Sequence, residues 1–174
     1  PSGLELMDKA TTAAVEPFVK AGYDLDAAAI LLVESDGTEA EVEAEIDKMK
    51  QVLATSGARS LQVSENEAQR LLYWAGRKSA FPAIGRISPD YYCMDGTIPR
   101  KRLGEMLSAI GEMEKKYGLG CANVFHAGDG DLHPLIMFDA NIPGELEKAE
   151  QFGGDILELS VKFGGSVTGE HGIG

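Results

Sequence analysis

The sequence contains few cysteines and no long apolar run. Its two cysteines, Cys93 and Cys121, lie far apart in apolar surroundings. A disulfide framework needs more cysteines than this, so we expect two small buried side chains in a reducing compartment. No segment approaches the roughly 20 apolar residues of a membrane span, and no signal peptide is recognisable. These absences predict a cytoplasmic protein without a membrane span.

Basic residues are also scarce. Sixteen Lys and Arg stand against 28 Asp and Glu, which gives a formal net charge of −12. This negative excess argues against nucleic acid and anionic membranes as partners. The length and the 44% hydrophobic content suit a single domain over 1–174. Because the sequence starts at Pro1 and stops inside a glycine-rich motif, we expect this domain to be a fragment of a longer protein.

The spacing of apolar residues predicts alternating helices and strands. The expected helices span 4–21, 38–56, 64–80, 100–117 and 144–163, and the expected strands span 28–34, 60–63, 91–94 and 166–168. The strand at 28–34 is apolar up to Val33 and is predicted to be central. This order predicts an α+β fold: an antiparallel or mixed sheet of two ferredoxin-like βαβ halves, with helices packed on one face.

A β-hairpin is predicted where two apolar runs flank Asp129-Gly130. With these as the two turn residues, His126 and His133 lie directly opposite each other on one face. Their Cβ atoms are then roughly 5 Å apart, close enough for both imidazoles to hold one metal ion. Pro134 cannot donate a backbone hydrogen bond, so this strand is expected at a sheet edge.

Two other interpretations of the hairpin stay open. The Gly-Asp-Gly-Asp run at 128–131 is a candidate Ca²⁺ or phosphate loop. It lacks the further carboxylates of a Ca²⁺ loop, and no Gly-Lys-Ser/Thr follows it. The second alternative is that the two histidines have a purely structural role.

A possible third ligand lies near the end of the sequence, where Glu170-His171 stands between glycines. Glycine on both sides predicts a close backbone approach or a positive φ. A carboxylate added to two imidazoles forms a donor set suited to Zn²⁺, Mn²⁺ or Fe²⁺. The alternative is a strand end with an exposed acid.

Three segments resemble one protein family over nearly the whole chain: HAGDGDLHP, GSVTGEHGIG and WAGRKSAFPAIGRISPDYYCMDGTIPR. They are similar to the C-terminal domain of FAD-linked oxidases of the vanillyl-alcohol-oxidase type, and within it to glycolate oxidase flavoprotein subunits and D-lactate dehydrogenases. The resemblance implies a cap domain that covers the flavin and holds a 2-hydroxy acid, while a separate domain binds most of the FAD.

The resemblance also implies roles for individual residues. His126, His133 and Glu170 fall on the metal ligands of metal-dependent members, and His171 falls on the general base. Arg77 falls on the arginine that pairs with the substrate carboxylate, for which bidentate guanidinium is well suited.

Other positions bear on the same site. Arg86 and Lys78 are rivals of Arg77 for the carboxylate, and Gly172, with the two residues before it, is expected near the flavin. Two positions depart from the family pattern. Asp131 replaces the usual Asn and adds negative charge beside the metal, and Cys93 stands where some relatives have a lysine.

The activity implied is oxidation of a small D-2-hydroxy acid, glycolate before D-lactate, by hydride transfer to FAD. The implied partners are the FAD-binding domain of the same protein and other oxidase subunits, which can attach it peripherally to the inner membrane. The fragment alone is expected to be inactive. The rival interpretation is a stand-alone metal-binding α+β module without catalysis.

Overall fold

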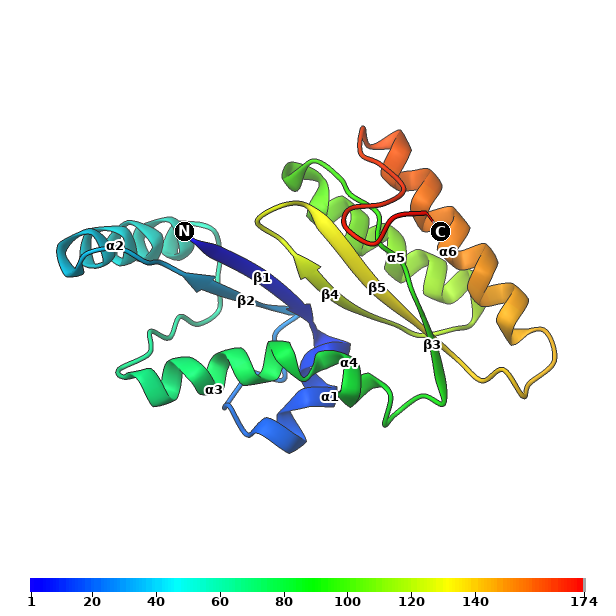
Figure 1. The fold of residues 1–174 in the computed structure, drawn as a ribbon, viewed down its shortest axis with the longest axis horizontal. Helices are drawn as coiled ribbons and strands as arrows, with labels where there is room; N and C mark the ends of the chain where they lie inside the picture. Colours follow the sequence, from blue (N-terminus) through cyan, green and yellow to red (C-terminus); the bar gives the residue numbers. More distant parts are fainter. Residues whose placement is uncertain (174) are drawn as a thin grey trace.

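The computed structural model describes residues 1–173, which form a five-stranded antiparallel sheet flanked by helices (Figure 1). The strands are β1 (Gly3–Asp8), β2 (Ala29–Glu34), β3 (Asp90–Cys93), β4 (Cys121–His126) and β5 (Asp131–Phe138), in the order β2-β1-β4-β5-β3. The helices are α1 (Lys9–Val19), α2 (Glu39–Thr55), α3 (Glu67–Lys78), α4 (Ala80–Ile84), α5 (Leu103–Tyr117) and α6 (Glu145–Lys162), with a 3₁₀ turn η1 (Arg100–Arg102). The predicted α+β class with an antiparallel sheet is confirmed.

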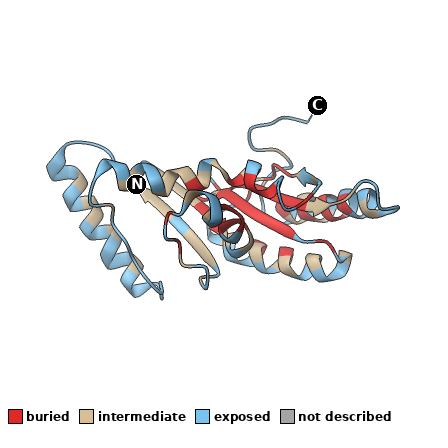
Figure 2. Ribbon diagram, turned by 90° about the horizontal axis from the view of Figure 1, so that it is seen from below, coloured by how far each residue is buried: buried red, intermediate tan, exposed pale blue. Residues whose placement is uncertain are grey.

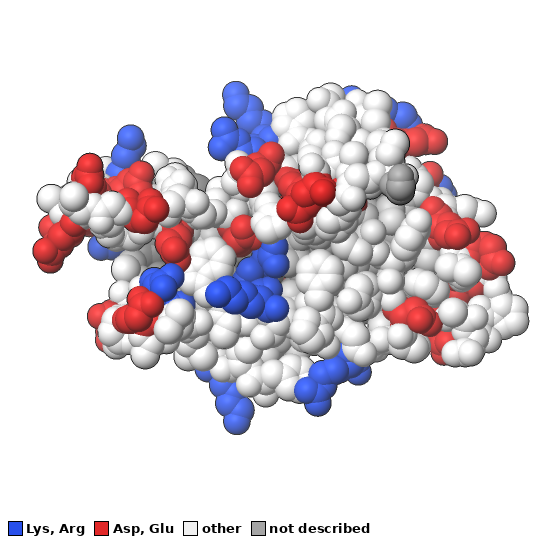
Figure 3. All heavy atoms as spheres, viewed as in Figure 1, with Lys and Arg blue, Asp and Glu red and all other residues white. Residues whose placement is uncertain are grey.

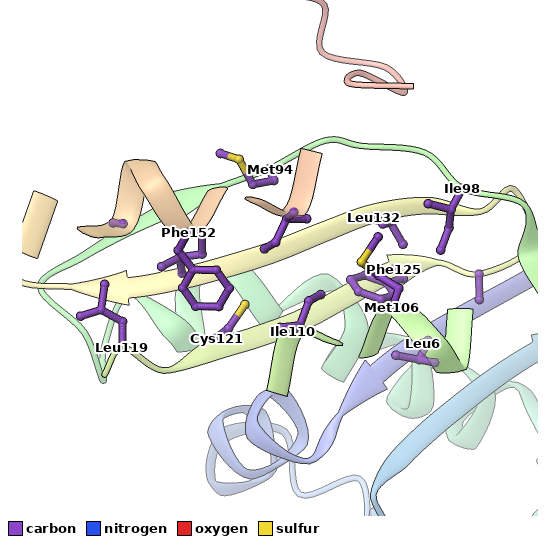
Figure 4. Close-up of a cluster of buried hydrophobic side chains, with 14 residues drawn as sticks. Leu6, Met94, Ile98, Met106, Ile110, Leu119, Cys121, Phe125, Leu132 and Phe152 are labelled. Carbon is purple, nitrogen blue, oxygen red and sulfur yellow. The ribbon is translucent and has the colours of Figure 1, made fainter. Parts of the chain in front are cut away.

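Helices cover both faces of the sheet, where one covered face was expected. The reason is that the central strands β4 and β5 are buried on both sides. Val124 belongs to a core with α1 and α4, whereas the next residue, Phe125, belongs to a core with α5 and α6. Figure 4 shows the second core, in which Phe125 lies near Met106 of α5, and Phe152 of α6 lies near Cys121 of β4. Each face of such a strand needs its own apolar cover.

The N-terminal segment is the largest difference from the expected elements. The predicted helix over 4–21 is wrong in its first part, because residues 3–8 form β1. Leu6 and Met7 point to opposite cores, as the two-residue period of a strand requires. Helix α1 begins only at Lys9, where the Asp8 side chain caps it by accepting the Thr11 N–H at 2.8 Å.

Two predicted strands do not form, and a third forms at the edge of the sheet where a central position was predicted. The apolar run 28–34 forms β2, but it lies at the sheet edge and leaves Leu31 46% exposed. The segment 60–63 forms no strand, and Ser166 makes only an isolated bridge to Thr97. Apolar runs this short do not distinguish a central strand from an edge or a loop.

The hairpin forms between β4 and β5, but its register is shifted by two residues. Four residues, 127–130, connect the strands, so His126 pairs with Asp131 and His133 pairs with Val124. The predicted direct pairing of the two histidines is therefore wrong, although a shift of two keeps both on the same face. The predicted edge position is also wrong, since β5 lies between β4 and β3. Pro134 is tolerated because the β3 ladder ends beside it, at Cys93.

Helix α2 lies apart from the rest of the fold. Figure 2 shows buried residues concentrated along the central strands and the helices beside them, whereas none of α2 is buried. Its predicted capping box is present, between Thr38 and Glu41. On the face seen in Figure 3, Asp and Glu side chains lie over this end of the molecule, and others lie near its middle and at the opposite end. Within 1–173, no helix is long and apolar enough to cross a membrane.

Both cysteines are free, as expected. Cys121 belongs to the buried core beneath α5 and α6, and Cys93 is half-buried at the end of β3. Neither therefore contributes a covalent constraint to the fold.

Candidate metal centre

The three predicted ligands come together at one end of the sheet. His126 ends β4, His133 lies near the start of β5, and Glu170 belongs to the segment after α6. Glu170 Oε1 lies 3.4 Å from His133 Nε2 and 3.8 Å from His126 Nε2. Together with Asp131, each can offer one donor atom such that all four atoms lie within 4.8 Å of one another. This spacing suits a single cation bound between them.

Several polar atoms in this cluster are buried without a hydrogen-bond partner. Both ring nitrogens of His133, which is 3% exposed, and Oδ1 of Asp131, which is 7% exposed, find none within the part of the chain described. An unpaired buried polar atom is costly, and such atoms are rare in native proteins. A cation held here would satisfy His133 Nε2 and neutralise the Asp131 carboxylate, so the donor set fits a metal ion.

Glu5 orients the first histidine. Its Oε1 lies 2.9 Å from His126 Nδ1, and its Oε2 accepts a hydrogen bond from Arg77 Nε at 2.8 Å. The carboxylate favours a proton on Nδ1, which leaves the lone pair of Nε2 free on the side facing Glu170. Carboxylate–histidine pairs of this kind are typical of the outer shell of metal sites. Arg77 is thus two contacts away from the ligand cluster.

Asp95 holds the segment that carries Glu170. Its carboxylate accepts the Thr168 Oγ1–H at 2.7 Å and the backbone N–H groups of Gly169, Glu170 and His171 at 2.9, 3.1 and 2.8 Å. Burial opposes ionisation of Asp95, but these donors outweigh it and hold its pKa well below the usual range. The residue therefore stays ionised and fixes the backbone on both sides of the ligand.

The glycines around Glu170-His171 have the two properties that the sequence predicted. A Cβ on Gly169 would lie 2.3 Å from Asp131 Oδ1, so only glycine permits this approach. Gly172 has a φ of 81°, in the left-handed region. Together they bring the segment against β5 and turn it away again.

His171 stacks on the buried histidine. The rings of His133 and His171 are nearly parallel, at 4°, with their centroids 5.0 Å apart. His171 Nε2 lies 3.7 Å from Glu170 Oε1, and its side chain is 49% exposed. It therefore combines a position beside the ligands with access from solvent.

Two members of the cluster have shifted protonation equilibria. Burial raises the pKa of Asp131 to about 6, and the carboxylates of Asp95 and Glu170 add to the rise. Burial and the neighbouring imidazoles lower the pKa of His133. His133 is consequently neutral at pH 7, the form in which imidazole binds a metal.

A family model for the C-terminal domain of FAD linked oxidases matches residues 1–174. The chain belongs to this family. It is 56% identical over its whole length to the glycolate oxidase subunit GlcD of Escherichia coli K12, covering 35% of that protein. It is 34% identical, again over its whole length, to GlcD of Bacillus subtilis, covering 37%. A mitochondrial D-lactate dehydrogenase [cytochrome] of Arabidopsis thaliana is 28% identical over 99% of the chain and 30% of the relative.

The FAD-linked oxidase domain described here thus spans about a third of the length of these relatives.

Of the two basic rivals to Arg77, Arg86 lies over the ring of Phe18, with its Cζ 4.0 Å from the ring centroid. Lys78 is exposed at the end of α3. Arg77 is the one joined to the ligand cluster, through Glu5.

Cys93 has a neutral thiol. Burial raises its pKa to about 12, and the carboxylates of Asp95 and Asp131 add to the effect. This position therefore supplies no cation to a substrate.

Glu5 and Asp95 are the two residues of the site that the sequence did not reveal. Glu5 lies inside the helix predicted over 4–21, and Asp95 follows the strand predicted over 91–94 without a signal of its own. A strand assignment for 3–8 would have placed Glu5 on the same face as Met7, which was the one available signal.

Proposed function

We propose that this chain is the substrate-side domain of an FAD-dependent oxidoreductase that oxidises a small D-2-hydroxy acid, glycolate or D-lactate, to the 2-oxo acid. The observation that carries the proposal is the convergence of His126, His133 and Glu170 in a member of the FAD-linked oxidase family. The names of its relatives, glycolate oxidase subunit and D-lactate dehydrogenase, supply the substrate class.

The two histidines and Glu170 would hold a divalent cation, Zn²⁺, Mn²⁺ or Fe²⁺. The unpartnered Nε2 of His133 and the free side of the His126 ring support this assignment. When bound by these residues, such a cation would supply Lewis-acid chemistry, which polarises a hydroxyl oxygen and lowers its pKa. The protein itself must keep the three donor side chains in place. Glu5 orients His126, and Asp95 holds the backbone of Glu170.

His171 is proposed as the general base that takes the hydroxyl proton of the substrate. A base must be within hydrogen-bond reach of the proton it accepts. The stacking on His133 and the hydrogen bond from the His171 backbone N–H to Asp95 fix the ring beside Glu170. Its exposed edge lets the accepted proton leave to solvent.

Arg77 is proposed to bind the substrate carboxylate. Glu5 engages only Nε, so the two terminal nitrogens keep their donors for another carboxylate. The Arg77 side chain in this ion pair is 11% exposed, and this burial favours a fixed guanidinium. Orientation of the substrate carboxylate would set the position of the α-carbon relative to the base.

FAD supplies the hydride acceptor. We expect another domain of the same protein to bind most of it, and the exposed residues Glu170, His171 and Gly172 to lie near the flavin. We further propose that the whole enzyme works in the cytoplasm, attached to the inner membrane only through partner subunits.

The proposal is tested by mixing the intact flavoprotein anaerobically with glycolate, D-lactate, L-lactate and longer 2-hydroxy acids. Bleaching of the oxidised flavin absorbance by glycolate or D-lactate, with L-lactate as the stereochemical control, is the expected result. Absence of bleaching by every 2-hydroxy acid would contradict the assignment and favour a metal-binding module without catalysis.

The metal site is tested separately by metal analysis of His126→Ala and His133→Ala variants of the intact protein. Each variant is expected to lose stoichiometric divalent metal, because each removes one of the proposed ligands. If both variants retain it, the cation lies elsewhere.

A further inference from the structure

Asp131 is part of the ligand cluster, although only three ligands were expected. It is paired with His126 in the β4–β5 ladder, and its Oδ2 lies 3.8 Å from His133 Nε2. Its carboxylate is one of the four groups whose donor atoms all lie within 4.8 Å. The side chain therefore points to the same space as the imidazoles and Glu170.

The surroundings of Asp131 only partly compensate the burial of its carboxylate. Its Oδ1 lacks a hydrogen-bond partner in the described chain, and the N–H of Gly169, which packs against this oxygen, donates to Asp95 instead. Asp95 differs, since hydroxyl and backbone donors surround its carboxylate, although its Oδ1 also lies 3.4 Å from His133 Nε2. A buried carboxylate oxygen without such donors is costly unless a cation neutralises it.

We propose that Asp131 is a fourth protein ligand, making a two-histidine, two-carboxylate centre for a six-coordinate cation, Mn²⁺ or Fe²⁺. This inference deepens the proposed function and rests on its metal site. Two carboxylates balance the charge of a divalent ion held between two neutral imidazoles.

The number of ligands decides between the candidate metals. Four protein ligands close a tetrahedral Zn²⁺ site, and catalytic zinc sites usually keep three protein ligands and one open position. Carboxylate-rich, octahedral sites suit Mn²⁺, and histidine–carboxylate sites with open positions suit Fe²⁺. With four protein ligands, six-coordination leaves about two positions open. These match the hydroxyl and carboxylate oxygens of a 2-hydroxy acid, which can bind one cation together.

The test compares Asp131→Asn with Asp129→Asn in the intact protein after removal of metal with a chelator. Both variants remove one negative charge from the same hairpin, but Asp129 is exposed in the turn and outside the cluster. Mn²⁺ and Zn²⁺ affinities are measured by competition with a metallochromic dye. Because Zn²⁺ generally binds more tightly than Mn²⁺ at any such site, the informative quantity is the change in the ratio of the two affinities.

We expect Asp131→Asn to weaken Mn²⁺ binding by at least the roughly tenfold that loss of an outer-shell partner costs, and to weaken Zn²⁺ binding less. Asp129→Asn should change neither. Water-proton relaxation of bound Mn²⁺ should report about two exchangeable waters on the unaltered protein and more on Asp131→Asn.

An Asp131→Asn variant that binds Mn²⁺ with unchanged affinity and hydration would overturn the fourth ligand while leaving the three-ligand site intact. Retention of Mn²⁺ by His133→Ala would instead overturn the metal site of the proposed function. Thermal unfolding of each metal-free variant shows whether it folds, and the Asn variant nearly conserves side-chain volume.

Discussion

Substitution of Glu5 tests whether a residue that is not itself a proposed ligand affects metal affinity by orienting one. Glu5 contacts no proposed substrate group, yet it orients His126 through Nδ1 and holds Arg77 through Nε. We predict that Glu5→Gln lowers divalent-metal affinity about 10–100-fold, the usual effect of losing an outer-shell carboxylate. Isothermal titration of the metal-free intact protein measures this change.

The matched control for Glu5→Gln is Glu34→Gln. Glu34, on β2, also pairs with an arginine, at 2.9 Å from Arg70 Nη1, but makes no contact with the ligand cluster. Its substitution removes the same charge and breaks a similar ion pair without changing metal affinity. Equal affinities in the two variants would mean that Glu5 has no role in positioning His126.

Some residues of the site could be predicted from short-range features of the sequence, and others could not. His126, His133 and Glu170 were predicted because turn spacing, flanking glycines and motif resemblance are all short-range features. Glu5 contacts a histidine that is 121 positions away in the sequence. Asp95 contacts residues that are 73 to 76 positions away. No short-range pattern distinguishes such a carboxylate from the many others in an acidic chain.

The elements were predicted well where amphipathic periodicity was long, and poorly where apolar runs were short. Helices α5 and α6 were expected close to their observed bounds, because 15 and 18 residues give several turns of periodicity. β1 was missed because its six residues run directly into α1. The hairpin was expected, but its register was not, since turn length sets the register and Asp-Gly does not fix that length.

The packing of α3 against the segment after α1 depends on one glycine. A Cβ on Gly76 would lie 2.1 Å from Tyr23 Oη and within 2.6 Å of two ring carbons, so the ring would have to move. That ring lies against α3, where its hydroxyl donates to the Tyr73 carbonyl. We predict that Gly76→Ala lowers the free energy of unfolding by about 1–3 kcal/mol, as overpacking typically does.

Chemical denaturation of Gly76→Ala and Gly111→Ala measures this effect. Gly111 lies within α5, and a Cβ there would meet nothing within 4 Å. Its replacement should stabilise the protein by up to about 1 kcal/mol, because alanine favours helix over glycine. A stabilising effect of both substitutions would show that Tyr23 can move without cost. Since Arg77 follows Gly76 directly, displacement of α3 should also weaken the pairing with Glu5.

At the scale of the whole molecule, the antiparallel sheet assembles the site from both ends of the chain. Glu5 lies near the start of the sequence whereas His126 and Glu170 lie in its last third, and β1 pairs directly with β4. Composition and periodicity predicted the α+β class, but neither can determine strand order, which depends on long-range pairing. The helices on both faces follow from that order, because central strands must be covered on two sides.

Production of residues 1–174 alone tests how the proposed activity is divided between domains. Every proposed metal ligand lies within this segment, so we predict that it binds about one divalent ion per chain, as the intact protein does. We also predict no flavin absorbance and no oxidation of glycolate or D-lactate with an artificial acceptor, because FAD is assigned to another domain. Metal analysis, absorbance spectra and dye reduction measure the three outcomes. Oxidation by the segment alone would show that it binds flavin itself, whereas metal binding by the intact protein only would place a ligand outside the segment.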